Sequence, residues 1–136
     1  MHAGIDHIIV NVNNYAAAKR FYAWLMPQIG YPNVTSYDQP EIDVTTGYFG
    51  GNGSVWIRPS DKEFRADKFH RHRVGLCELA FSADSRQRID DLAKQIPAHG
   101  GEVTDLPKEY DYVPGYYSVF LTDPDGMKLE LVHVPR

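Results

Sequence analysis

The chain has 136 residues, with 14 Lys and Arg against 18 Asp and Glu, so its formal net charge is −4. This acidic balance argues against nucleic-acid binding, and no apolar run is long enough to cross a bilayer. Hydrophobic residues make up 43 %, enough for the core of one compact domain spanning 1–136. The single cysteine, Cys77, excludes an internal disulfide. With no signal peptide at its start, we expect a cytoplasmic protein.

The first half predicts a strand, a helix and three further strands. Residues 5–12 alternate and are β-branched, which favours a strand, and the apolar spacing over 15–26 favours a helix. Asn13 or Asn14 offers the N-cap of this helix, and Pro27 is expected to stop it. Short strands are expected near 33–38, 43–50 and 54–59, with turns at Pro40 and 50–53.

The same order restarts at residue 74. Residues 74–83 predict a strand in which Cys77 is a buried small hydrophobe, and Asp84 with Gln87 forms a capping-box signal for a helix. Strands are expected at 102–107, 116–123 and 127–134, with a hairpin turn at Asp125-Gly126. The predicted fold class is therefore α+β, with two tandem βαβββ modules. Module one covers about 4–60, the linker about 61–73 and module two about 74–135.

Three ionisable residues fall on the strand faces that the helices should leave uncovered. His7 and Glu78 hold the same place in the first strand of each module, and Glu130 lies in the last strand of the second. An ionised carboxylate in an apolar strand needs a partner. If the two sheets form a half-open barrel, Glu78 faces His7 and Glu130 across a cavity.

The stretches DHIIVNVNNYAAAKRFY and YYSVFLTDPDGMKLELVHV resemble the vicinal oxygen chelate superfamily, which includes glyoxalase I, extradiol dioxygenases and the fosfomycin and bleomycin resistance proteins. The DPDG turn before Leu129-Glu130-Leu131 is the more specific signal. The resemblance implies metal ligands on the first and last strands of each module, which by position are His7, Trp56, Glu78 and Glu130. Trp56 cannot ligate, and Glu78 stands where many members have His. The implied cofactor is a divalent ion (Mn, Fe, Zn or Ni) held by His7, Glu78 and Glu130.

Each candidate also has a structural interpretation. His7 alone could be a hydrogen-bonded core histidine, and Glu78 could pair with an arginine such as Arg58 or Arg73. Two carboxylates in one cavity repel, and a metal, a buried arginine or Lys128 would relieve that cost. His70 and His72, in the linker stretch FHRHR, are either solvated or folded over the cavity mouth as an acid/base or a contact for a substrate anion.

Aromatic residues complete the expected site. Trp56, at the vacant ligand position, should form an apolar wall or a stacking surface for a planar substrate. Of the tyrosines at 110, 112, 116 and 117, we expect one or two to line the pocket. Tyr112 and Tyr117, together with Trp56 and Arg58, are the predicted substrate-binding residues.

Two functions are compatible with these residues. The first is a metal-dependent lyase, isomerase or ring-opening enzyme, less favourably an extradiol-type dioxygenase. Its catalytic base would be His72, or Glu78 if that residue is displaced from the metal. The second is a metal-free protein that sequesters an aromatic or cationic small molecule, as bleomycin resistance proteins do. The expected partner is a small molecule, with neither nucleic acid nor membrane, and the resemblance implies a homodimer.

Overall fold

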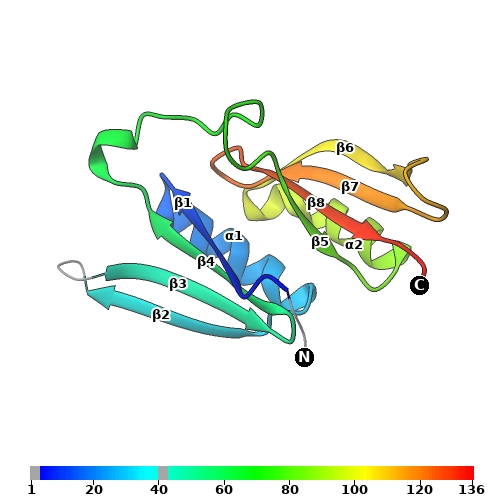
Figure 1. Cartoon of the computed structure of the whole chain (residues 1–136), viewed down its shortest axis with the longest axis horizontal. Coiled ribbons are helices and arrows are strands. Elements are labelled where there is room, and N and C mark those ends of the chain that lie inside the picture. Colours follow the sequence, from blue (N-terminus) through cyan, green and yellow to red (C-terminus); the bar gives the residue numbers. More distant parts are fainter. Residues whose placement is uncertain (1–3, 40–42) are drawn as a thin grey trace. The chain divides into compact units, whose positions relative to one another are not determined.

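The computed structural model describes residues 4–39 and 43–136, and the turn expected at Pro40 lies outside them. The chain divides into two compact units, residues 1–67 and 68–136, and each has its own four-stranded sheet and one α-helix (Figure 1). The predicted βαβββ order, written twice, is confirmed. Among the described residues, no helix is long and apolar enough to cross a membrane.

In the first unit the strands run in the order β1-β4-β3-β2, with β1 parallel to β4 and the other pairs antiparallel. The elements are β1 (His7–Val12), α1 (Tyr15–Gln28), β2 (Asn33–Gln39), β3 (Asp43–Gly50), β4 (Gly53–Pro59) and the short 3-10 helix η1 (Lys62–Phe64). The neighbouring strands β1 and β4 are parallel, so no hairpin can join them. The chain passes from β1 to β4 through α1, β2 and β3.

Helix α1 covers one face of this sheet. The Asn14 side chain accepts a hydrogen bond from the Ala17 backbone N–H at 3.0 Å, so Asn14 is the N-cap. The expectation that Pro27 stops the helix is wrong, because α1 continues through Pro27 to Gln28. Pro27 has no N–H to donate to the carbonyl of the preceding turn, and the helix ends one residue later.

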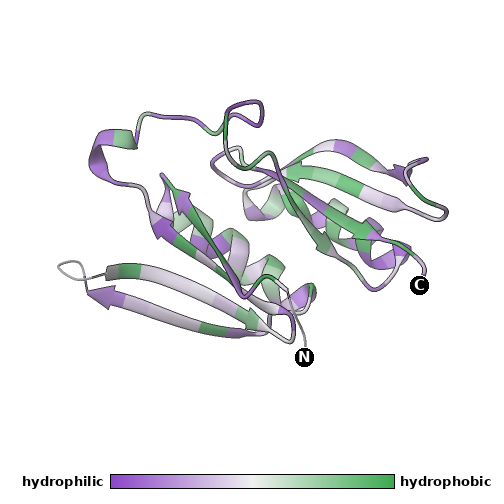
Figure 2. Cartoon of the chain, viewed as in Figure 1, coloured by the Kyte–Doolittle hydropathy of each residue, from purple (hydrophilic) through white to green (hydrophobic). Residues whose placement is uncertain are grey.

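In the second unit the strand order is β5-β8-β7-β6, again with a parallel first pair, β5 and β8. The elements are β5 (Leu79–Ser82), α2 (Arg86–Gln95), the 3-10 helix η2 (Ile96–His99), β6 (Glu102–Glu109), β7 (Tyr117–Thr122) and β8 (Lys128–His133). The middle of β7 is green in Figure 2, and β7 is buried over most of its length.

Three expectations for the start of the second unit are wrong. The strand predicted over 74–83 is only Leu79–Ser82, because Gly75 takes a positive φ of 123° that breaks the extended chain before it. Cys77 lies in this irregular stretch and is exposed rather than buried. The N-cap of α2 is Ser85, whose hydroxyl accepts from the Arg88 backbone N–H at 3.1 Å, and not Asp84.

The DPDG turn joins β7 and β8 as predicted. The buried Asp123 side chain accepts hydrogen bonds from the backbone N–H groups of Asp125, at 2.9 Å, and Met127, at 3.0 Å. These contacts satisfy turn donors that the strands leave unpaired. They fix the start of β8 and therefore the strand position of Glu130.

Sheet register makes the two units equivalent residue by residue. Ile9 of β1 pairs with Trp56 of β4, and Ala80 of β5 pairs with Glu130 of β8. Both the first-strand and the last-strand residues therefore correspond at the spacings expected from the sequence. Trp56 and Glu130 hold the same place in the two sheets.

Candidate functional site

The helix-free face of the first sheet is the face opposite α1. Val10 and Val12 are buried on the side of the helix, whereas Ile9, the next residue in the alternation, is 56 % exposed. Register places His7 and Ile9 beside Ser54 and Trp56 on the helix-free face. The predicted grouping of His7 with Trp56 on one face is thus present within the first unit.

Trp56 lies flat across this face because Gly47 leaves room for it. Gly47 is its register partner on β3, and a Cβ on Gly47 would lie 2.6 Å from the indole atoms Cδ2 and Cε3. Such a distance is far inside van der Waals contact, so a side chain at position 47 would displace the ring. The sequence analysis did not identify Gly47, and its only signal is a glycine inside a strand.

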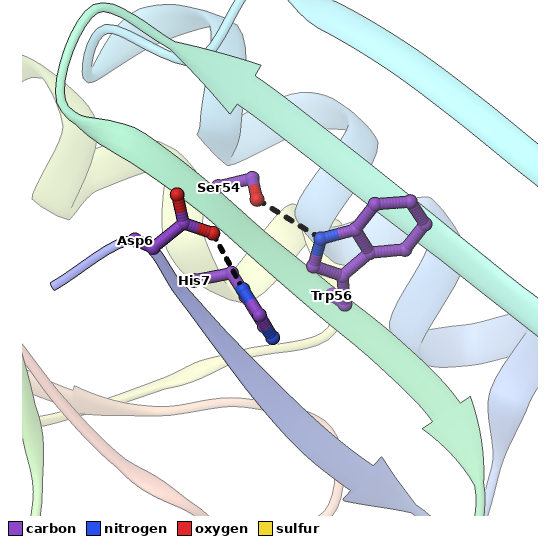
Figure 3. A network of polar contacts seen from close by, with 4 residues as sticks. All are labelled: Asp6, His7, Ser54 and Trp56. Carbon is purple, nitrogen blue, oxygen red and sulfur yellow. Dashed lines mark hydrogen bonds and ion pairs between the residues drawn. The ribbon is translucent and has the colours of Figure 1, made fainter.

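Two further aromatic rings flank the indole. Tyr37 of β2 stacks near-parallel to Trp56 with ring centroids 6.1 Å apart, and Phe49 meets it edge-on at 5.1 Å. The indole N–H donates to Ser54 Oγ at 2.9 Å, which fixes the ring in the sheet plane (Figure 3). We call Trp56, Tyr37 and Phe49, lying over Gly47, the aromatic platform.

His7 is oriented by its neighbour in the chain. Its Nδ1 lies 2.7 Å from Asp6 Oδ1, and Figure 3 shows the imidazole beside this carboxylate. A carboxylate at Nδ1 holds the proton there and leaves the Nε2 lone pair available to a ligand. Asp6 was missed from the sequence, although an acid directly before a candidate His is a usable signal.

Glu78 faces Lys128. The Lys128 ammonium lies 3.1 Å from Glu78 Oε2, an ion pair without the alignment of a hydrogen bond, and both side chains are partly buried. Lys128 also sits over the Phe120 ring, 4.5 Å from its centroid. Of the partners considered for Glu78, the structure thus supplies Lys128, which lies in the same unit.

Glu130 is the most buried acid among the predicted site residues. It is 2 % exposed, and its Oε1 accepts a hydrogen bond from the Tyr116 hydroxyl at 2.5 Å. Burial, and then the hydrogen bond to Glu130, raise the pKa of Tyr116. The tyrosine therefore stays a donor and meets the need of a buried carboxylate for a polar partner.

The tyrosines of the second unit divide between its two faces. Tyr112 is exposed, stacks near-parallel on Tyr110 at 5.5 Å and meets Tyr116 edge-on at 5.1 Å. Tyr117 instead points to α2, where its hydroxyl donates to Asp90 Oδ1 at 2.6 Å and Arg86 lies over its ring. Tyr117 thus attaches the helix to the sheet, and its contact with a substrate stays a prediction.

His70 and His72 line a pocket within the second unit. This pocket, of about 390 Å³, is bounded by the segment 69–72 and by residues of β6, β7 and β8, Lys128 among them. Arg58, in contrast, belongs to the first unit, where it is exposed at the end of β4 beside Asn11.

The residues present fit a divalent cation only in part. Within either unit, the described residues bring together no three His, Cys, Asp or Glu side chains that could hold a metal. His7 belongs to the first unit, and Glu78 and Glu130 to the second. The Asp6–His7 pair suits a metal ligand, whereas Glu78 does not fit one as it lies, because the Lys128 ammonium would repel a second cation.

The chain matches relatives along nearly its whole length. The family model described as "Glyoxalase/Bleomycin resistance protein/Dioxygenase superfamily" matches residues 4–131. The uncharacterized protein YqjT of Bacillus subtilis (strain 168) is 29 % identical over 129 residues, which are 94 % of this chain and 97 % of YqjT.

Solved structures agree with this match. A glyoxalase family protein from Enterococcus faecalis is 27 % identical with a TM-score of 0.69, covering 95 % of this chain and 96 % of that one. A glyoxylase/bleomycin resistance protein/dioxygenase domain from Frankia sp. EAN1pec has a TM-score of 0.77 at 20 % identity, covering 100 % and 95 %, which shows the shared fold. The chain therefore belongs to the Glyoxalase/Bleomycin resistance protein/Dioxygenase superfamily.

Proposed function

We propose that the protein binds a small planar organic molecule on the aromatic platform of its first sheet. The observation that carries this proposal is the Trp56 indole, which lies flat over Gly47 between Tyr37 and Phe49. Stacking on aromatic faces favours flat, conjugated ligands. Such a ligand corresponds to the metal-free, sequestering function.

The apolar surroundings of the platform support this choice. Tyr37 is 53 % exposed and Ile9 is 56 % exposed, both on the helix-free face. Large apolar side chains that a sheet leaves uncovered together typically mark a binding surface. Arg58, on the same face, is a proposed contact for a polar group of the ligand.

The charges of the second unit agree with a function that needs no metal. Lys128 meets the charge of Glu78, and Tyr116 donates to Glu130. Each carboxylate therefore has a partner supplied by the chain itself. Tyr112, exposed beside this group, is a proposed ligand contact.

Fluorescence titration tests the proposal. The chain has two tryptophans, Trp24 and Trp56, so the Trp24→Phe variant reports on Trp56 alone. We expect planar aromatic compounds from a panel of neutral, cationic and anionic members to quench this emission. In a Trp56→Leu variant their affinity, measured by calorimetry, should fall about tenfold, because a stacked pair contributes about 1 kcal/mol beyond its buried area. Equal affinity in the Trp56→Leu and Trp24→Phe variants would contradict the proposal.

A metal-dependent enzyme is the second candidate, and the Asp6–His7 pair favours it. A carboxylate on Nδ1 is the usual support of a histidine that ligates through Nε2. A bound divalent ion would supply a Lewis acid for a substrate with vicinal oxygens. The proposed ligands are His7, Glu78 and Glu130, and Glu78 would have to leave the Lys128 ammonium to bind the ion. The base would be His72, or Glu78 if it is displaced from the metal.

Elemental analysis by mass spectrometry separates the two candidates. Protein purified without chelator or metal-affinity tag should carry near-stoichiometric Mn, Fe, Ni or Zn if the second candidate holds. His7→Ala and Glu130→Ala should then lose the metal, while His99→Ala, on η2, should keep it. Full metal content in both site variants would show that these ligands are wrongly assigned.

A homodimer is also proposed, from family membership. Analytical ultracentrifugation tests it directly. A single species of about 31 kDa, twice the 15.5 kDa chain, is expected. A species at the monomer mass up to high concentration would contradict it.

A further inference from the structure

We propose that the pocket of the second unit binds a small hydroxylated oxyanion, a carboxylate or a phosphate. The pocket has a volume of about 390 Å³ and is lined by the segment 69–72, by Thr104 and Asp105 of β6, by Thr122 of β7 and by Lys128 of β8. This volume is at the small end of the range for ligand pockets, roughly 300–1,000 Å³. The proposal concerns the second unit alone and does not depend on the aromatic platform.

Hydrogen bonds within the segment 69–72 leave each of its two imidazoles with one N–H that can donate to a ligand. His70 Nδ1 accepts from the His72 backbone N–H at 3.2 Å, and His72 Nε2 accepts from Arg71 Nε at 3.2 Å. A ring nitrogen that accepts carries no proton, so each neutral imidazole keeps its proton on the other nitrogen. His70 thus offers Nε2–H and His72 offers Nδ1–H.

Two permanent cations add to these donors. Arg71 uses only Nε in its contact with His72, which leaves its terminal N–H groups for a ligand. The Lys128 ammonium has three donors, and its pairing with Glu78 engages one side of it. A planar guanidinium matches the oxygens of a carboxylate or phosphate, and hydrogen bonds to such charged groups are stronger than neutral ones.

Asp105 and the threonines restrict the ligand further. Asp105 is the acid among the lining residues, and its carboxylate accepts but does not donate. It would repel the oxyanion if that group lay beside it, but it suits a hydroxyl on the same molecule. The hydroxyls of Thr104 and Thr122 can serve either part. A hydroxy acid or the phosphate ester of a polyol combines both features.

Titrations followed by amide NMR test this assignment with three probes: inorganic phosphate, lactate and, as a neutral polyol, glycerol. Phosphate or lactate should produce saturable shifts at 69–72, Thr104 and Thr122, and glycerol should not. Phosphate binding without lactate binding assigns the site to phosphates, and the reverse assigns it to carboxylates. Shifts that do not saturate, or that lie elsewhere, would overturn the proposal.

Two variants of the pocket should change the affinity for the anion in opposite directions. Arg71→Ala should weaken binding of the active anion about tenfold, because it removes a charged donor. Arg88→Ala, on the exposed side of α2 and outside the pocket, is the matched control and should leave the affinity unchanged. Asp105→Asn should strengthen phosphate binding severalfold, because it removes the opposing charge. Equal weakening in the Arg71 and Arg88 variants would mean non-specific attraction and would sink the proposal.

Discussion

The helix-free faces of the two sheets share a register but differ in chemistry. In the first, Trp56 pairs with Gly47, and in the second, the equivalent Glu130 pairs with Phe120. Each pair contains one large aromatic ring. In the first unit the ring belongs to the last strand, β4, and in the second unit it belongs to β7, the strand before the last. The first face is therefore an aromatic surface with few charges, whereas the second holds an ion pair and a buried carboxylate.

This difference shows that backbone pairing and site chemistry can vary independently. Both faces are held by a parallel pair of strands covered on the far side by one helix. Packing against the helix fixes the alternate residues, and the remaining positions are open to change. The two faces of this chain thus differ at a few helix-free positions, and fold alone does not identify function.

The largest expected effect comes from truncating the aromatic ring of the second face. Phe120 is 7 % exposed and contacts Tyr110 edge-on at 5.5 Å. Phe120→Ala should lower the free energy of unfolding by about 3–5 kcal/mol, because it removes buried area and leaves a cavity. Guanidinium denaturation measures this, with the 53 % exposed Phe64 as control. Phe64→Ala should change stability by less than about 0.5 kcal/mol.

On the first face the corresponding test adds a side chain instead of removing one. Gly47→Ala should destabilise the protein by about 1–3 kcal/mol and displace the indole, because the new Cβ overlaps it. The measurements are urea denaturation and Trp56 emission in the Trp24→Phe background. Gly51→Ala is the matched control, since a Cβ there meets nothing within 4 Å. Similar emission in both alanine variants would contradict the flat orientation of the ring.

The charged face can be tested by a double-mutant cycle on Glu78 and Lys128. Glu78→Gln and Lys128→Met, alone and combined, should show a coupling energy of about 1 kcal/mol, because the pair is partly buried. The exposed pair of Arg86 and Glu109 in the same unit should couple by about 0.5 kcal/mol or less. A coupling at Glu78 no larger than this reference would mean that the ion pair is absent in solution.

The smallest expected effect is on the free energy of unfolding at alkaline pH. The test compares one tyrosine from each unit. Burial raises the pKa of Tyr48 to about 12, and burial with the Glu130 hydrogen bond raises the pKa of Tyr116. The unfolded value is about 10, so the folded state holds these protons more tightly. The stability they contribute is complete below about pH 10 and is lost as the pH rises through the folded values. Tyr48→Phe and Tyr116→Phe should each decline less steeply than wild type above pH 10 in denaturation experiments. Identical slopes would contradict both shifts.

Much of this architecture could be predicted from the sequence. The repeat, the element order, the Asn14 cap and the DPDG turn follow from patterns within a few residues of each other. The family resemblance, not alternation alone, implied that His7 and Trp56 lie together, and the register of β1 and β4 places them on one face. The predicted element boundaries were wrong where the conformation of one residue set them. Gly75 takes a positive φ ahead of β5, and Pro27 stays within α1.

The partners of the site residues were harder to predict. The sequence allowed several cations as partners of Glu78, and Lys128 was one of them. The pairing of the strands decides that the partner is Lys128. Tyr116 reaches Glu130 from the loop before β7, and loop geometry has no periodic signal in the sequence. Gly47 matters because a side chain there would overlap the indole, and a glycine inside a strand indicates close approach without naming the residue that approaches.

The aromatic ring lies on β4 in the first unit, as Trp56, and on β7 in the second, as Phe120. This difference has an evolutionary consequence. Starting from the pair at 47 and 56, a Phe at position 47 is forbidden while the indole lies above it. Trp56 must shrink first, and only then can position 47 grow, so the two substitutions are epistatic and their order is constrained. A change from one pair to the other that avoids this overlap passes through a face that lacks a ring on both strands. That bare intermediate would offer a new ligand an unoccupied surface, which gives this fold a route for changing specificity without disturbing its helices.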